Sequence, residues 1–153
     1  MNIYSKFKTD ENAETNGVWV DIGDGASVKV ARLGNPNHEK IMERLRKPYR
    51  GILRTGGSLP DSVSTDIAIK GIVDSILLDW DGFQDENGKD LPYSQEAADK
   101  LLREMKDFRE LVAFLATEQE TFRAEGLKEA AKNSEPPSDG GSSGESKKTS
   151  SKT

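Results

Sequence analysis

Hydrophobic and polar positions alternate over residues 17–33. Residues 18–21 and 26–33 are rich in β-branched and apolar side chains, and Gly23, Asp24 and Gly25 between them are typical of a tight turn. Val28 and Val30 fall on alternate positions, as in a strand with one covered face. This pattern predicts a β-hairpin.

Helical spacing of apolar residues predicts three helices, at about 36–47, 61–79 and 95–124. Asn35 followed by Pro36 favours the start of the first helix, and Pro48 favours its end. The segment 61–79 is the most apolar, so we expect it at the centre of the core. The segment 95–124 follows Ser94, a good N-cap residue, and has the strongest periodicity in the chain.

Two strands alone are only marginally stable, so helices must cover the hairpin. The predicted fold class is therefore α+β, mostly α: an N-terminal β-hairpin packed on two or three helices. We expect one folded domain over residues 1–133. Residues 134–153 contain no hydrophobic side chain and predict a disordered Ser/Gly/Lys tail.

Composition narrows the class of protein. The 153 residues are 33% hydrophobic and 32% charged, and the absence of cysteine excludes disulfides and thiolate zinc sites. No segment has the run of about 20 apolar residues that a membrane-spanning helix needs. The net charge of -5 argues against nonspecific nucleic-acid binding, because phosphates require a positive surface.

Candidate chemistry is sparse. His38 is the single histidine, with no second His or Cys to complete a metal site. Around Asp85 the acidic loop resembles a calcium loop, but Lys89 and Asp90 occupy positions that need a ligand and a glycine. The glycines match no nucleotide-binding pattern. We therefore expect no enzyme activity, no cofactor and no metal.

A basic cluster is the best hint of nucleic-acid binding. It contains six cationic side chains between residues 40 and 54, namely Lys40, Arg44, Arg46, Lys47, Arg50 and Arg54. Tyr49 is the one aromatic residue inside it, which is little for stacking on bases. We expect a solvated helix face that pairs with the acidic loop or with an acidic partner.

Large apolar side chains exceed what so small a body can bury, which favours an exposed apolar groove for a partner. The candidate partner-binding residues flank the acidic loop or lie along the last helix: Trp80, Phe83, Phe108, Leu111, Phe114, Leu115 and Phe122.

Several short motifs together resemble those of the tail assembly chaperones of long-tailed (siphovirus-type) bacteriophages. They are Asn35-Pro-Asn, the sequence KPYR at 47–50, ILLDWDGF at 76–83, and DENGKDLPYS at 85–94 before a helix. The likeness covers about residues 16–122, and the order of the motifs is more specific than any one of them.

This resemblance implies a non-enzymatic chaperone that binds the tape measure protein and keeps it soluble in the host cytoplasm during tail tube assembly. Such a protein is absent from the mature virion. Many of these chaperones are also made in a longer form by ribosomal frameshifting, which would contact the tail tube protein; Lys147 and Lys148 are compatible with a slippery codon run. Self-association stays open.

Two alternatives from other classes remain. One is a structural component of the virion, a head-tail connector or tail completion protein. The other is a small nucleic-acid-binding regulator that uses the basic cluster 40–54.

Overall fold

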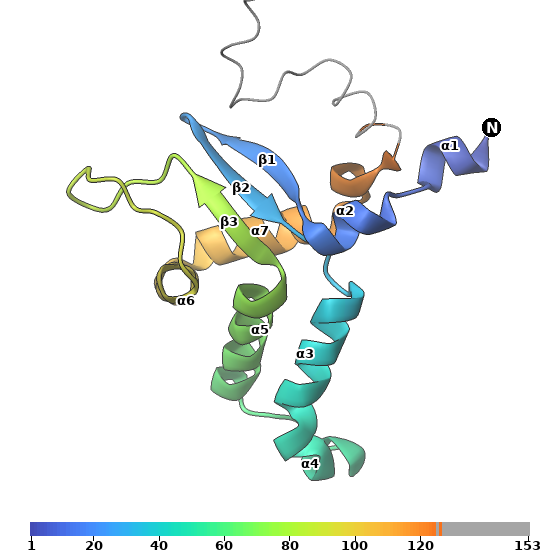
Figure 1. Cartoon of the computed structure of the whole chain (residues 1–153). Coiled ribbons are helices and arrows are strands. Elements are labelled where there is room, and N and C mark those ends of the chain that lie inside the picture. Colours follow the sequence, from blue (N-terminus) through green and yellow to red (C-terminus); the bar gives the residue numbers. More distant parts are fainter. Residues whose placement is uncertain (125, 127–153) are drawn as a thin grey trace, which may run out of the picture.

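The computed structural model describes residues 1–124 and 126 (Figure 1). Two short helices open the chain, α1 (Ile3–Phe7) and α2 (Glu11–Asn16), and the sequence analysis did not predict them. Each begins at a residue whose side chain caps it: Asn2 accepts from the backbone of Tyr4 and Ser5, and Asp10 accepts from Ala13. The predicted tail at 134–153 lies outside the described residues.

The predicted hairpin is confirmed as β1 (Val18–Gly23) and β2 (Ala26–Val30), which pair antiparallel. Asp24 and Gly25 both have positive φ in the connecting turn, the backbone conformation that primed hairpin turns require. Val28 and Val30 are fully buried on one face, as the alternation predicted.

A third strand extends the sheet, and it corrects the predicted helix at 61–79. Helix α5 (Asp61–Ser75) ends earlier, and β3 (Leu77–Asp81) follows and pairs with β2 in the order β1-β2-β3. Leu77 and Trp80 are both buried in this bulged strand. A short apolar run fits a buried strand as well as a helix, and the free edge of β2 decides between them.

Helix α3 (Pro36–Arg46) confirms the first predicted helix, and the Asn35 side chain accepts hydrogen bonds from the backbone of Asn37 and His38. The turn η1 (Lys47–Tyr49) and the short helix α4 (Arg50–Arg54) follow. Helices α3 and α5 lie side by side and run in opposite directions, with α4 at their far end (Figure 1). We call this projection, α3 through α5, the arm.

The arm is closely packed at Gly71. A Cβ atom added there would lie 2.6 Å from the sulfur of Met42 and 3.4 Å from Nε2 of His38. The absence of a side chain on α5 therefore lets α3 approach.

The long predicted helix at 95–124 is divided, which is a second correction. Helix α6 (Gln95–Glu104) ends at Met105, whose backbone is extended, and α7 (Lys106–Thr117) and the turn η2 (Gln119–Phe122) follow. The side chain of Arg109 donates to the carbonyl of Leu102 at 2.7 Å, which satisfies a group that the break leaves free. Neither glycine nor proline marks this break.

One core joins these elements. Helix α7 lies behind the sheet in Figure 1, and the inner end of α5 meets the sheet beside α6. The largest fully buried side chains come from all of these elements: Phe122, Ile69, Ile76, Leu77, Leu102, Val28, Val30 and Val112. The predicted fold class is confirmed, with one more strand than expected.

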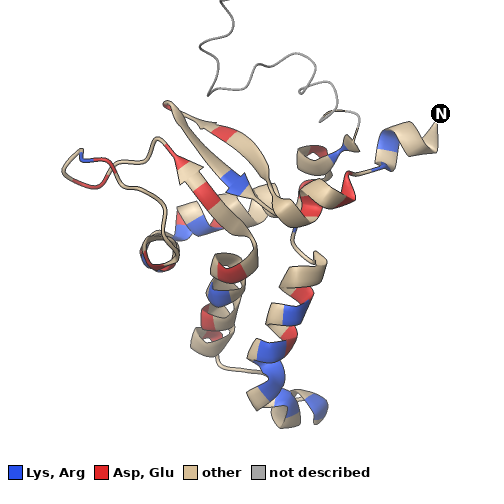
Figure 2. Cartoon of the chain, in the orientation of Figure 1, with Lys and Arg blue, Asp and Glu red and all other residues tan. Residues whose placement is uncertain are grey.

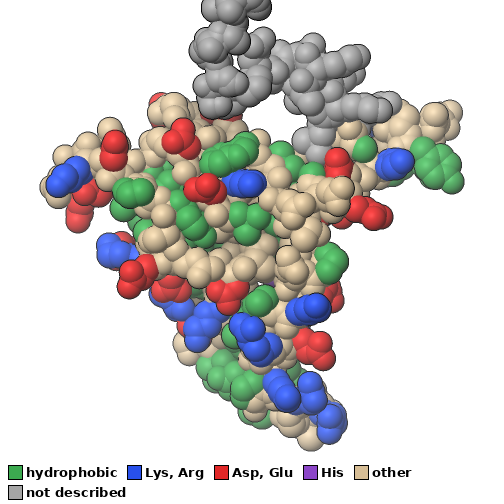
Figure 3. Space-filling view, viewed as in Figure 1, with side chains coloured by type: hydrophobic (Ala, Val, Ile, Leu, Met, Phe, Trp, Pro, Cys, Tyr) green, Lys and Arg blue, Asp and Glu red, His purple; other side chains and the backbone are tan. Residues whose placement is uncertain are grey.

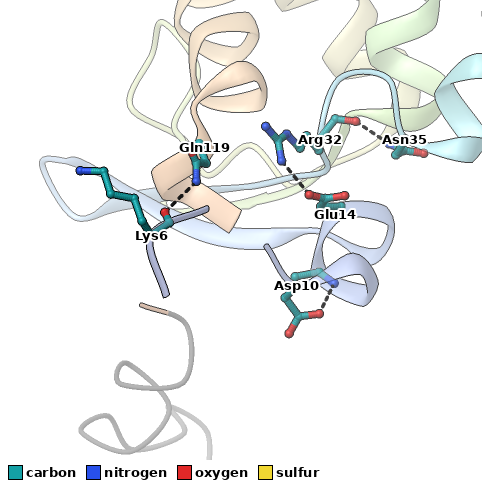
Figure 4. A network of polar contacts seen from close by, with 7 residues as sticks. Lys6, Asp10, Glu14, Arg32, Asn35 and Gln119 are labelled. Atoms are coloured by element: carbon teal, nitrogen blue, oxygen red, sulfur yellow. Dashed lines mark hydrogen bonds and ion pairs between the residues drawn. The ribbon is translucent and has the colours of Figure 1, made fainter. Parts of the chain in front are cut away.

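The two ends of the described chain are tied together (Figure 4). The backbone of Asp10 donates to Phe122, and that of Ala124 donates to Lys8. Nearby, Gln119 donates from its side chain to the Lys6 carbonyl at 3.0 Å, and Arg32 pairs with Glu14 at 2.7 Å. The segment before β1 is therefore fixed to the segment after α7.

Candidate functional site

An apolar groove lies between α6, the start of α7 and the loop after β3. Six of its lining residues are hydrophobic: Phe83, Leu91, Ala97, Leu101, Met105 and Phe108. Charged side chains stand among them, from Asp85 and Glu86 in the loop and from Lys100 and Glu104 on α6. We call this feature the groove.

An aromatic cluster forms the wall of the groove. The rings of Trp80 and Phe83 stack at 4.6 Å, Tyr93 meets Trp80 edge-on at 5.0 Å, and Phe108 meets Phe83 edge-on at 5.7 Å. The Trp80 indole N–H donates to the carbonyl of Leu91 at 2.7 Å. This bond holds the loop against the sheet.

Tyr93 anchors the other side of the loop. Its hydroxyl donates to the Leu77 carbonyl at 2.9 Å, and burial, assisted by the nearby carboxylates of Asp79 and Asp74, raises its pKa above the usual value. Tyr93 is therefore a neutral hydrogen-bond donor at physiological pH. The groove wall is pre-formed by these contacts.

A line of hydrophobic residues continues from the groove along α7. Met105, Phe108, Leu111 and Phe114 are spaced three residues apart, so their side chains neighbour one another on the helix surface. Phe114 is 57% exposed, Met105 44% and Leu111 36%. We call these four residues the stripe.

The structure separates the seven candidate partner-binding residues. Trp80 and Phe122 are buried in the core. Phe83, Phe108 and Leu115 are partly buried against that core, and Leu111 and Phe114 are exposed. The surface that a partner can reach therefore consists of the groove and the stripe.

The burial of Phe122 and the exposure of Met105 each have a physical cause. Phe122 is buried because η2 turns the chain back toward β1, where the Arg32 guanidinium lies 5.8 Å from the centre of its ring. Sequence reasoning missed Met105, because the helix break that exposes it has no local signal.

The six cationic residues of the basic cluster lie together on α3, η1 and α4, at the outer part of the arm (Figure 2). All six are exposed. Within the described part of the chain, Arg44 reaches Asp74 at 3.6 Å and the other five form no ion pair. The expected pairing with the acidic loop does not occur within one chain, because that loop lies at the other end of the molecule (Figure 2).

One ion-pair network connects α5 with α6. Arg103 contacts Asp66 at 2.7 Å and Asp99 at 2.9 Å, and Lys70 contacts Asp66 at 3.2 Å. The hydrogen bond from Arg103 is the main cause that lowers the pKa of Asp66, and the two carboxylates raise the pKa of Arg103. These groups hold helices in place at the surface.

His38 lies on α3, facing α5. Its Nδ1 accepts a hydrogen bond from the backbone of Gly34 at 3.1 Å. Burial is the main cause that lowers its pKa; Arg46 acts in the same direction and Glu39 opposes it. The neutral ring is therefore the form that the fold favours.

Among residues 1–124 and 126, no group of three or more His, Cys, Asp or Glu side chains is placed to hold a metal ion. The same described region contains no helix long and apolar enough to cross a membrane.

The groove, the stripe and the arm all lie within the part of the chain that matches a known protein family. The family model described as YdaY prophage protein matches residues 33–133, from the segment before α3 to beyond η2. The chain therefore belongs to the YdaY prophage protein family and is phage-derived. Comparison with curated proteins and with solved structures gave no match.

Proposed function

We propose that this phage-derived chain is a tail assembly chaperone, a non-enzymatic protein that binds the tape measure protein and keeps it soluble in the host cytoplasm until the tail tube surrounds it. The observation that supports this most is the stripe, which leaves Phe114 and Met105 about half exposed beside an apolar groove. A large apolar surface of this kind on a small chain is typical of a partner site.

The shape of this surface fits an amphipathic helix. Helix α7 has 12 residues and so spans about 18 Å, enough to contact several turns of a partner helix. Helix-in-groove recognition uses apolar anchors three or four residues apart, the spacing at which the stripe presents its own side chains. Met105 can adjust to different anchors because its side chain is flexible.

A tape measure protein is a long helical chain with apolar stripes, and it needs such a cover before assembly. The charged residues around the groove, Asp85, Glu86, Lys100 and Glu104, would keep the uncovered surface hydrated. The family assignment supports a phage partner over a host protein.

The test is co-expression with the tape measure protein of the same phage genome, followed by affinity capture. For the full chain we expect the two proteins to co-purify and the tape measure protein to stay soluble. Phe114→Asp should reduce capture by about tenfold or more, because a charge replaces the most exposed aromatic anchor of the stripe. Its free energy of unfolding should change by less than about 0.5 kcal/mol, since the side chain is exposed.

Tyr4→Asp is the matched control, because Tyr4 is also an exposed aromatic residue but lies on α1, away from the groove. It should leave capture unchanged. Equal loss in both variants, or a tape measure protein that precipitates regardless of this chain, would contradict the chaperone function. Detection of several copies in purified particles would instead favour a head-tail connector or tail completion protein.

A further inference from the structure

Two separate regions of the molecule carry opposite net charge (Figure 2). Residues 36–54 contain six Lys or Arg against two Glu, a net charge of +4. Residues 79–90 contain five Asp or Glu against one Lys, a net charge of -4. The first set lies on the outer arm, and the second lies on β3 and the loop that follows it.

Most of the positive charge of residues 36–54 is unpaired within the described part of the chain. From residue 44 to residue 54 there are five cations and no acidic residue. Lys40, Arg46, Lys47, Arg50 and Arg54 are exposed and, among the described residues, none of them forms an ion pair. Such a concentration of like charge favours an anionic partner.

The acidic side chains of residues 79–90 are likewise unpaired in the described part of the chain. Asp81, Glu86 and Asp90 are exposed, and neither they nor Asp79 and Asp85 form an ion pair among the described residues. Asp85 accepts from the backbone of Asn87 and Lys89, which fixes the shape of the loop. We call residues 79–90 the acidic end.

The residues on the arm surface are more typical of a protein-binding surface than of a nucleic-acid-binding surface. Its concave side contains Leu33, Met42 and Leu53 next to the cations, and Leu53 is 41% exposed. Glu39 and Glu43 stand in the same concavity and would repel phosphates. Tyr49 is half-buried and does not line this concavity, so no aromatic platform for bases is present there.

We infer that the arm of one copy docks on the acidic end of a second copy. Residues 36–54 of the arm and the acidic end carry equal and opposite net charge, and the packing of α3 on α5 holds the arm away from the acidic end of its own chain (Figures 1 and 2). The contact must therefore form between chains. Figure 3 shows the cations gathered at the tip of the arm and acidic side chains on the loop and the sheet.

This contact is heterologous, because each copy uses two different surfaces. Repeated, it builds a ring or an open chain of copies rather than a closed two-fold dimer. The inference does not depend on the chaperone function, since it concerns this chain alone. The stripe uses other residues, but the groove shares Phe83, Gln84, Asp85 and Glu86 with the acidic end. A docked arm would therefore compete with a partner at the loop side of the groove and leave the stripe on α7 accessible.

The experiment is sedimentation velocity of the purified full chain, with two charge-reversal variants. Wild-type chains should associate at about 0.05 M salt, and raising the salt to about 0.5 M should weaken the association about tenfold or more by screening the charges. Arg46→Glu/Arg50→Glu and Asp81→Lys/Glu86→Lys should each be monomeric alone. Mixed in equal amounts, the two variants should associate in pairs, because the unchanged residues 36–54 of one variant (+4) meet the unchanged acidic end of the other (-4), whereas the altered surfaces each have a net charge of zero.

Lys6→Glu/Lys8→Glu is the matched control, because it reverses two exposed cations outside the arm and should leave association unchanged. Circular dichroism and thermal midpoints should show all three variants folded. A wild-type chain that stays monomeric at low salt would overturn the inference, as would a mixture that fails to associate. Salt-sensitive binding of a short DNA duplex by an otherwise monomeric chain would assign the arm to nucleic acid instead.

Discussion

At Gly82 the end of β3 crosses the hairpin turn more closely than any other residue type allows. A Cβ atom there would lie 2.4 Å from the backbone oxygen of Gly25, and the backbone has a φ of +81°. Gly88 in the following loop has nearly the same φ, +79°, but open space around it. The two glycines therefore separate the effect of conformation from the effect of contact.

Gly88→Ala should destabilise the fold by about 1–2 kcal/mol, the usual cost of a left-handed conformation for an L residue. Gly82→Ala should cost clearly more, because the new methyl group also meets the hairpin backbone. Urea unfolding of both variants measures the difference. Equal losses of stability in the two variants would mean that the hairpin backbone moves away from the new methyl group without loss of stability.

The single histidine makes stability depend on pH in a defined direction. The pKa of His38 is lower in the folded chain than its ordinary value of 6.5, so the unfolded chain binds the proton more readily. The stabilising contribution of the neutral ring is therefore fully present above about pH 6.5 and is lost as the pH falls toward the folded pKa. Protonation also removes the Nδ1 acceptor used by Gly34.

His38→Asn should reduce this pH dependence, because an amide oxygen can accept from Gly34 but does not titrate in this range. Free energies of unfolding of both proteins, measured from about pH 7.5 to pH 5, provide the test. Parallel curves for the variant and the wild type would assign the pH dependence to other groups.

At the scale of elements, the ion-pair network fixes the angle between α5 and α6. Arg103→Met removes contacts to Asp66 on α5 and to Asp99 on its own helix, and should destabilise by up to about 1 kcal/mol, since the side chain is 36% exposed. Lys100→Met is the control, because Lys100 pairs only within α6, with Glu104, and should cost a few tenths of a kcal/mol.

Adding Asp66→Asn to both backgrounds gives a double-mutant cycle. The cycle should give a measurable interaction free energy between Asp66 and Arg103 and almost none between Asp66 and Lys100. Because the pKa of Asp66 is lowered in the folded chain, the Arg103 coupling is present above about pH 4 and is lost as the pH falls through the folded pKa. Coupling that persists when Asp66 is protonated would contradict an ionic origin.

The elements show where sequence reasoning succeeds. The hairpin, α3 and the start of α6 are all marked by local chemistry: the Gly23–Gly25 turn, the Asn35 cap before Pro36, and the Ser94 cap. The third strand and the division at Met105 were not predicted, because tertiary partners decide them: β2 offers Leu77–Asp81 an edge, and Arg109 completes the end of α6.

The candidate site was predicted in part for the same reason. The periodicity of α7 pointed to Leu111 and Phe114, which are exposed, as well as to Leu115, which packs on the core. Sequence spacing gives the face of a helix but not what covers it. The turn that buries Phe122 and the strand that buries Trp80 could therefore not be inferred from the sequence.

For the whole molecule, charge and shape act together. The chain carries a net charge of -5, yet its arm is positive, so the remainder is more acidic than the total suggests. The sequence showed both charged segments, and the fold adds their separation to opposite ends (Figure 2). That separation turns a predicted pairing within one chain into a contact between chains.

The tie between residues 8–10 and 122–124 also has a consequence for how this protein can be extended. It brings both ends of the described fold to one pole, and the tip of the arm is at the opposite pole (Figure 1). A module fused before α1 would start at this pole, far from the arm tip (Figure 1). A reporter fused at the N-terminus should therefore leave the chain-to-chain contact undisturbed.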